Sequence, residues 1–205
     1  MPFMLPSPLL SSPSRPLTWR SWLPCALILV LFGAAAGVVD PWLEYQRSAL
    51  EQGQWWRLWS AHWVHANLAH ALLNVSGFVL CCLVFSDLYR RHTLLLWWLL
   101  APPLLSAALW IGDGLEGPYV GLSGMLHSWL VWALVVGLPG HPRLHGVLLL
   151  ALGGRLLWEQ LPGYDSGYLS AWVPGSVYVN AHLYGALLGL AGGLVSLLWR
   201  RRSRR

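Results

Sequence analysis

Six apolar segments divide the chain and limit what it can fold into. They are 22–39, 63–86, 93–111, 122–138, 144–158 and 178–199, and the connections between them carry most turn-forming and charged residues. A helix needs about 20 apolar residues to cross a bilayer, so only 144–158 is short. Charged residues make up 10% of the chain, whereas a soluble domain carries about 25%. The sequence therefore predicts an all-α polytopic membrane protein, a bundle of six transmembrane helices.

The ends of the chain differ in composition from this bundle. Residues 1–20 are rich in Pro and Ser and are expected to form a disordered cytoplasmic tail. The membrane domain is expected over 21–199, and a basic cytoplasmic tail over 200–205. The first apolar segment, with Arg20 before it and three alanines at 34–36, also resembles a secretory signal with its cleavage site. Its length favours a retained membrane span.

The basic residues indicate how the bundle is oriented. All 13 are Arg, and with the N-terminus in the cytoplasm ten of them fall in cytoplasmic segments. Of the eight acidic residues, only Asp87 is then cytoplasmic. This bias is the positive-inside pattern. It predicts that both termini are cytoplasmic, and it explains the net charge of +5 without a nucleic-acid partner.

A few polar side chains interrupt the apolar segments, where they are costly and usually functional. They are His65, His70 and Asn74 in the second segment, Ser123 and His127 in the fourth, and His182 in the sixth. These three spans all run from the outside inwards. His65, Ser123 and His182 each lie near the outer end of their span, at similar depth. The pattern predicts one site at the outer face.

Ser123 is the candidate nucleophile. It lies between Gly121 and Gly124 at the expected start of a helix, where the backbone N–H groups are free to stabilise an anion. The candidate base is His182, which precedes a stripe of small residues that lets helices touch. The stripe consists of Gly185, Gly189 and Gly193. If it packs on the fourth span, the histidine faces the serine; the alternative is helix packing with a capping histidine.

His70 and Asn74 are four residues apart and share one face of a helix. Both side chains donate hydrogen bonds. With the backbone N–H of Ser123 they are expected to stabilise an oxyanion. The alternative is a buried polar pair that ties helices together.

The sequence lacks the residues that other kinds of intramembrane protease need. No His-Glu-x-x-His zinc motif is present, no Lys is available for a Ser/Lys pair, and no Asp lies inside an apolar segment. The cysteines Cys25, Cys81 and Cys82 lie in apolar segments and suggest neither a disulfide nor a metal site. We therefore expect no cofactor and no metal. Since no acid is placed to orient a histidine, we expect a Ser–His dyad rather than a triad.

Over about residues 40–195, the chain resembles a known family, the rhomboid intramembrane serine proteases. The matching motifs are Gly121-Leu122-Ser123-Gly124, Ala181-His182-x-x-Gly185-x-x-x-Gly189, the His65, His70, Asn74 pattern and Trp56-Arg57. The resemblance implies a six-helix rhomboid-like bundle, with Ser123 as nucleophile and His182 as base. It also implies that His70 and Asn74 line the oxyanion site.

One residue departs from the common rhomboid pattern. Many rhomboids carry Tyr four residues after the nucleophile, stacked on the catalytic histidine, whereas this chain has His127. That ring orients His182, fills space or has a third catalytic role. Gly-Leu-Ser-Gly-x-Leu-His is similar to the rhombosortase branch. Those enzymes are thought to process exported bacterial proteins that carry a C-terminal Gly-Gly-type sorting tail.

The resemblance implies an endopeptidase of the bacterial inner membrane. Its partners would be the lipid bilayer and transmembrane or C-terminally anchored protein substrates, cleaved near the outer face. Two other functions stay open. One is a non-catalytic rhomboid-like protein that binds and escorts membrane proteins. The other is a small transporter or haem protein that uses the buried histidines.

Overall fold

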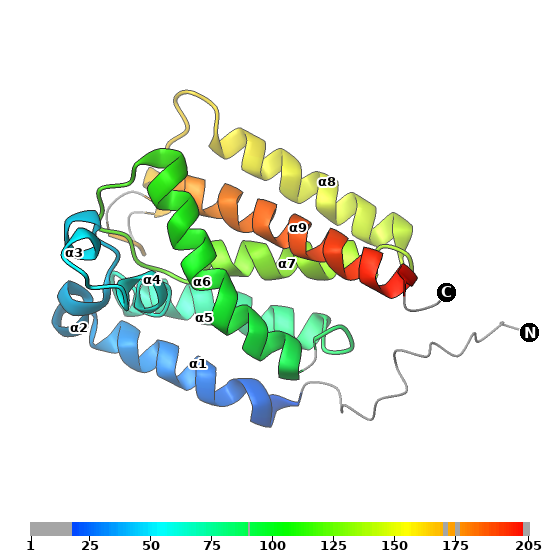
Figure 1. Ribbon diagram of the computed structural model, residues 1–205, viewed down its shortest axis with the longest axis horizontal. Coiled ribbons are helices and arrows are strands. Elements are labelled where there is room, and N and C mark those ends of the chain that lie inside the picture. The colour runs from blue at the N-terminus through cyan, green and yellow to red at the C-terminus, as the bar shows by residue number, and fades with distance from the viewer. Residues whose placement is uncertain (1–17, 90, 170–171, 175–176, 203–205) are drawn as a thin grey trace, which may run out of the picture.

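The computed structural model describes residues 18–89, 91–169, 172–174 and 177–202, and most of them are helical, with no strand in those ranges. Figure 1 shows three short helices, α2, α3 and α4, at one end of the bundle, which we call the short-helix end. The start of α1 and the end of α9 lie at the opposite end. The helices are α1 Trp19–Ala34, α2 Ala36–Leu43, α3 Arg47–Glu51, α4 Arg57–Ser60, α5 Leu68–Val84, α6 Arg91–Asp113, α7 Ser123–Gly137, α8 Pro142–Glu159 and α9 Val179–Arg202, with a 3-10 turn at Gly167–Leu169.

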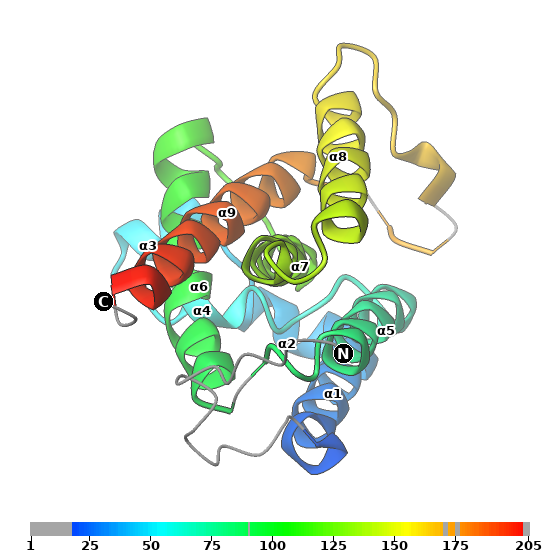
Figure 2. The same ribbon diagram turned by 90° about the vertical axis from the view of Figure 1, so that its right-hand side faces the viewer.

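Helix α7 is the centre of the bundle. In Figure 2 it is seen end on, with α5, α6, α8 and α9 around it. Its residues are apolar on every side and most of them are buried, as expected for a helix enclosed by others. Trp129 of α7 stacks on Phe78 of α5, with ring centroids 5.3 Å apart. The first residue of α7, Ser123, is therefore held by a helix that is fixed along its length.

The glycine stripe of α9 packs on α7. A Cβ added at Gly185 would overlap the carbonyl oxygen of Gly124, and one added at Gly189 would overlap that of Ser128. The two backbones touch there because neither position carries a side chain. The packing predicted from the stripe is confirmed, and it fixes the position of His182 relative to the start of α7.

The outer helices carry many exposed Leu side chains, which suits contact with lipid. Two helical stretches, Thr93–Asp113 and Val179–Arg202, are each long and apolar enough to cross a bilayer. The apolar stretches Trp22–Ala34, Leu68–Val84 and Ser123–Gly137 are shorter. This helical architecture fits a membrane protein.

Several segment ends differ from the predictions. The first apolar segment does not form one helix: α1 ends at Ala34, where the Ala35 N–H bonds both Leu31 O and Phe32 O and tightens the last turn. Helix α1 already begins at Trp19, so the expected tail over 1–20 is two residues too long; 1–17 lie outside the described residues. Helix α9 continues through Arg202 into the expected basic tail, since Arg is a good helix former and suits a helix C-terminus.

The second apolar segment becomes helical later than predicted. Helix α5 starts at Leu68, because the Asn67 side chain caps it by accepting the His70 backbone N–H at 2.8 Å. His65 therefore lies in the connection before the helix. The prediction that it lies on the second helix is wrong.

The segments at the short-helix end hold the loop that leads to α7. Tyr45 and Tyr119 exchange backbone hydrogen bonds of 3.0 Å, and Gly121 N–H donates to Ala61 O at 3.0 Å. Behind them, the buried guanidinium of Arg57 donates to Gln54 Oε1 and to the carbonyls of Glu44 and Pro41 at 2.7–2.8 Å. These contacts bind the loop before Ser123 to residues far away in the chain.

Candidate active site

Ser123 and His182 meet at the short-helix end. Ser123 is the first residue of α7, and His182 lies in the first turn of α9. Ser123 Oγ and His182 Nε2 are 3.0 Å apart, within hydrogen-bonding distance. The close packing of α7 and α9 produces this contact, because Gly124 has space for no side chain beside the Ala181 carbonyl.

A third residue, Glu159, joins this pair. Its Oε2 is 3.0 Å from His182 Nδ1, and its side chain is only 5% exposed. The expectation that no acid is placed to orient the histidine is wrong. Helix α8 extends one residue beyond the apolar segment 144–158, and its last residue faces the first turn of α9. Hydropathy alone ends that segment at 158 and leaves Glu159 in the connection that follows.

The hydrogen bonds determine which ring nitrogen of His182 carries the proton. The other oxygen of Glu159, Oε1, forms an ion pair of 3.0 Å with Arg155 Nη2, which favours the ionised carboxylate. A carboxylate only accepts hydrogen bonds, so His182 Nδ1–H is the donor to it. The Nε2 lone pair then accepts the hydrogen bond from the Ser123 hydroxyl. A general base needs this arrangement.

His127 stacks on His182, with ring centroids 4.3 Å apart and planes 19° from parallel. Its Nδ1–H donates to the Ser123 carbonyl at 2.8 Å, which keeps the ring in place one turn into α7. Of the three interpretations of His127 from the sequence, this geometry favours a ring that orients His182.

His70 and Asn74 lie on α5 against Gly121. A Cβ added at Gly121 would come within 2.9 Å of His70 Cε1 and 3.9 Å of Asn74 Nδ2. Gly121 also has φ +125°, which other residues rarely adopt. Asn74 Nδ2 is buried and has no hydrogen-bond partner. A buried unpaired donor is unusual in proteins and is available to a ligand at this place.

His65 lies behind His70, and the two rings meet edge to face at 5.0 Å. Both ring nitrogens of His65 are buried without a partner. Among the described residues, the ring of His65 contacts His70 and forms no hydrogen bond with Ser123 or His182.

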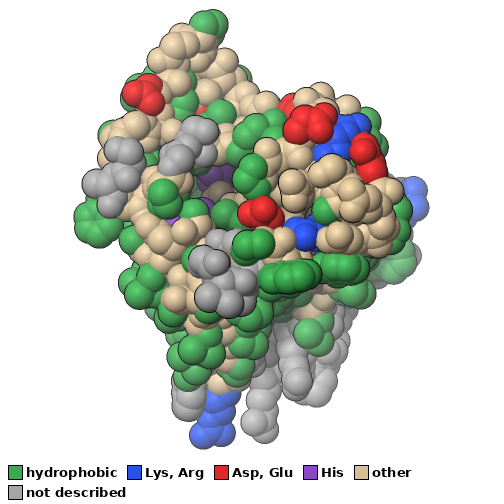
Figure 3. Space-filling view, turned by 90° about the vertical axis from the view of Figure 1, so that its left-hand side faces the viewer, with side chains coloured by type: hydrophobic (Ala, Val, Ile, Leu, Met, Phe, Trp, Pro, Cys, Tyr) green, Lys and Arg blue, Asp and Glu red, His purple; other side chains and the backbone are tan. Residues whose placement is uncertain are grey.

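The short-helix end is open at this site. Figure 3 looks onto that end and shows histidine side chains inside a hollow, with acidic side chains on the surface around it. The described residues contain no group of three or more His, Cys, Asp or Glu side chains arranged to hold a metal ion.

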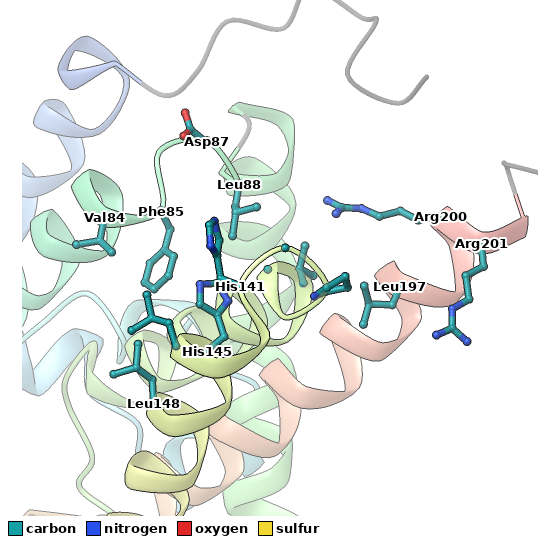
Figure 4. Close-up of a pocket in the computed structure, with 15 residues that line it drawn as sticks. Val84, Phe85, Asp87, Leu88, His141, His145, Leu148, Leu197, Arg200 and Arg201 are labelled. Atoms are coloured by element: carbon teal, nitrogen blue, oxygen red, sulfur yellow. The ribbon is translucent and has the colours of Figure 1, made fainter. Parts of the chain in front are cut away.

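A separate cavity of about 650 Å³ lies at the far end of α7, near Gly137. Figure 4 shows its lining, which includes His141, His145, Arg200 and Arg201. None of the residues predicted for the site lines it.

Comparison with known proteins identifies the family. The family model described as the Rhomboid domain matches residues 52–199, which is more than half of the chain and includes every candidate site residue. No curated protein matches the chain. Members of the matched family are serine intramembrane proteases. The chain is therefore a member of the rhomboid family, and it is a membrane protein built from apolar helices.

Proposed function

We propose that this chain is an intramembrane serine endopeptidase in which Ser123 is the nucleophile and His182 the general base. The observation that carries the proposal is the 3.0 Å contact between Ser123 Oγ and His182 Nε2 inside a matched rhomboid domain. A serine with a neutral histidine at hydrogen-bonding distance is an activated nucleophile.

The reaction follows serine protease chemistry. His182 Nε2 takes the proton of the Ser123 hydroxyl as Oγ attacks the substrate carbonyl. The tetrahedral intermediate collapses when the same proton passes to the leaving amine, which breaks the peptide bond and leaves an acyl ester on Ser123. Water then attacks this ester with His182 again as base, and the free serine is regenerated.

The negative charge on the tetrahedral oxygen requires donors. We assign them to His70, Asn74 and the first N–H groups of α7, which have no acceptor in their own helix. The unpaired Asn74 Nδ2 beside Gly121 supports this assignment. The positive end of the α7 dipole acts in the same direction.

We propose that the substrates are membrane-anchored proteins cut near the outer face, in particular exported proteins with C-terminal Gly-Gly-type tails. The Gly-Leu-Ser-Gly-x-Leu-His sequence, similar to the rhombosortase branch, supports this substrate class. An apolar cavity of about 320 Å³ between α5 and α7, lined by Gly77, Leu126 and His127 among others, offers a surface for an apolar anchor next to the site. Comparing the exported proteins of a knockout strain with those of the parent tests it: retained C-terminal tails identify substrates, and an unchanged set refutes the substrate class.

We propose that the chain lies in the bacterial inner membrane with six spans and both termini in the cytoplasm. The short-helix end, with the site, would then face outwards. The Arg distribution supports this orientation. A reporter fused after Arg205 is expected to be active only in the cytoplasm. Periplasmic activity of that reporter would overturn the topology.

The catalytic proposal is tested by labelling with a fluorophosphonate probe. The wild-type protein is expected to be labelled at Ser123, whereas Ser123→Ala and His182→Ala are expected to lose labelling and still insert. Ser128→Ala is the matched serine control, because Ser128 lies on the same helix and its hydroxyl has no partner. An unlabelled wild-type protein that co-purifies with membrane proteins would instead favour the escort function.

A further inference from the structure

A mechanism with two residues does not explain the buried carboxyl group of Glu159. Glu159 ends α8 inside the bundle, with a side chain only 5% exposed, and it faces the histidine of the proposed base. A buried carboxylate is costly unless it is paired, so its presence beside His182 requires an explanation.

Both oxygens of Glu159 have a partner. Oε1 pairs with Arg155 Nη2 one turn earlier on α8, and Oε2 accepts from His182 Nδ1–H, each at 3.0 Å. Arg155 is itself held in place, because its Nη2 also donates to Tyr164 Oη at 2.9 Å and Tyr168 Oη at 2.7 Å. The carboxylate is thus fixed between a positioned cation and the ring nitrogen that faces away from Ser123.

We propose that Glu159 is a positioning residue for the reaction, so that Ser123, His182 and Glu159 form a triad in place of a dyad. This inference rests on the proposed function. Glu159 holds His182 in the Nδ1–H tautomer, which leaves the Nε2 lone pair directed at the Ser123 hydroxyl. When Nε2 takes the serine proton, the imidazolium that forms lies beside a carboxylate. Glu159 keeps its charge throughout and transfers no proton.

A purely structural role is the competing explanation, since the same contact also ties α8 to α9. The two roles have different consequences. A tie contributes to stability alone, whereas a positioning carboxylate also sets the tautomer of His182 and the free energy of its protonated form. The experiment must therefore measure reactivity against pH as well as stability.

The test uses the full-length protein in detergent and the rate of fluorophosphonate labelling. Glu159→Gln preserves size and removes the charge. The maximal labelling rate is expected to fall about 10²–10⁴-fold, with little change in probe affinity. The acid limb of the pH–rate profile is expected to move to lower pH, because the imidazolium loses its counter-charge. Glu159→Asp, which retains the charge, is expected to recover part of the rate. Glu51→Gln is the control, since it removes an exposed carboxylate paired only with Arg47.

The outcomes separate the two proposals. If wild-type protein is not labelled at Ser123, the proposed function fails. If it is labelled and Glu159→Gln reacts at the wild-type rate with an unchanged pH profile, only the triad fails. Nitrogen-15 NMR of histidine-labelled wild-type protein reports the tautomer of His182 directly. The His182 signals are assigned by comparison with His182→Gln, so this measurement does not depend on the folding of a Glu159 variant. The Nδ1–H tautomer supports the triad, and the Nε2–H tautomer overturns it.

Discussion

Replacing Gly185 with alanine tests whether contact between the α7 and α9 backbones positions the site. The new Cβ would overlap the Gly124 carbonyl oxygen and lie 2.8 Å from its carbon, where ordinary contact begins at 3.4 Å. Both atoms belong to backbone, so no side chain can rotate away and the helices must separate. Overpacking of this kind costs up to about 3 kcal/mol, and alanine returns about 1 kcal/mol of helix propensity. We expect a net loss of about 2 kcal/mol.

The same separation moves His182 away from Ser123. A misplacement of about 1 Å in an active site can cost about 100-fold in rate, and we expect a loss of that size in fluorophosphonate labelling of Gly185→Ala. The assays are labelling rate and thermal unfolding in detergent, measured on the same preparation.

Gly153→Ala is the matched control. Gly153 also lies inside a long helix, α8, but a Cβ added there has no atom within 4 Å. This variant is expected to be fully active and up to about 1 kcal/mol more stable, through helix propensity alone. If Gly185→Ala and Gly153→Ala have the same stability and labelling rate, contact between the α7 and α9 backbones does not position the site.

Three further predictions concern groups around the site. Arg57→Lys is expected to lower the free energy of unfolding by about 3 kcal/mol, because an ammonium cannot reach all three diverging acceptors of the guanidinium. Thermal unfolding in detergent measures this loss, and a wild-type midpoint would contradict it. Asp113→Asn is expected to cost about 1–3 kcal/mol, since the carboxylate accepts from Tyr178, Asn180 and Tyr184 and an amide cannot serve all three; an unchanged midpoint would refute this. Burial lowers the pKa of His62, in the connection before α5, from 6.5 to about 4. Because the unfolded state binds more protons than the folded state between these pH values, stability should fall as the pH drops through this window. His62→Gln is expected to reduce that slope, and an identical slope in the variant would contradict the assignment.

The residues that approach one another in the site could largely be predicted from the sequence. Ser123 and His182 are polar groups on different apolar segments at the same expected depth, and the glycine stripe indicated which two helices touch. Apolar segments and small-residue repeats are strong signals because a bilayer restricts the chain to a few architectures.

Glu159 could not be predicted from hydropathy, since the apolar segment ends one residue before it and the residue resembles the start of a polar connection. Its contact with His182 joins residues 23 positions apart. A signal was nevertheless present: the predicted topology puts the end of the fifth span and the start of the sixth at the same face. Asn67 is a similar case, because an Asn directly before an apolar helix is a common cap and would have placed His65 outside α5.

The short helices α3 and α4 were also beyond prediction, because they are too brief to show a period. Their role depends on contacts such as the three hydrogen bonds of Arg57, which join parts of the chain that are distant in sequence. Tertiary contacts rather than local helix propensity stabilise these two short helices.

The paired hydrogen bonds between Tyr45 and Tyr119, together with that from Gly121 to Ala61, join the segment 45–61 to the loop before Ser123. A surface segment would ordinarily tolerate insertions and exchange between relatives. Here residues 45–61 supply the backbone groups to which the loop before Ser123 is hydrogen-bonded. A chimaera that takes this segment from another family member would therefore also change the geometry around Ser123. Its fluorophosphonate labelling rate should depend on the donor of the segment, even when every residue from Ser123 onward is retained.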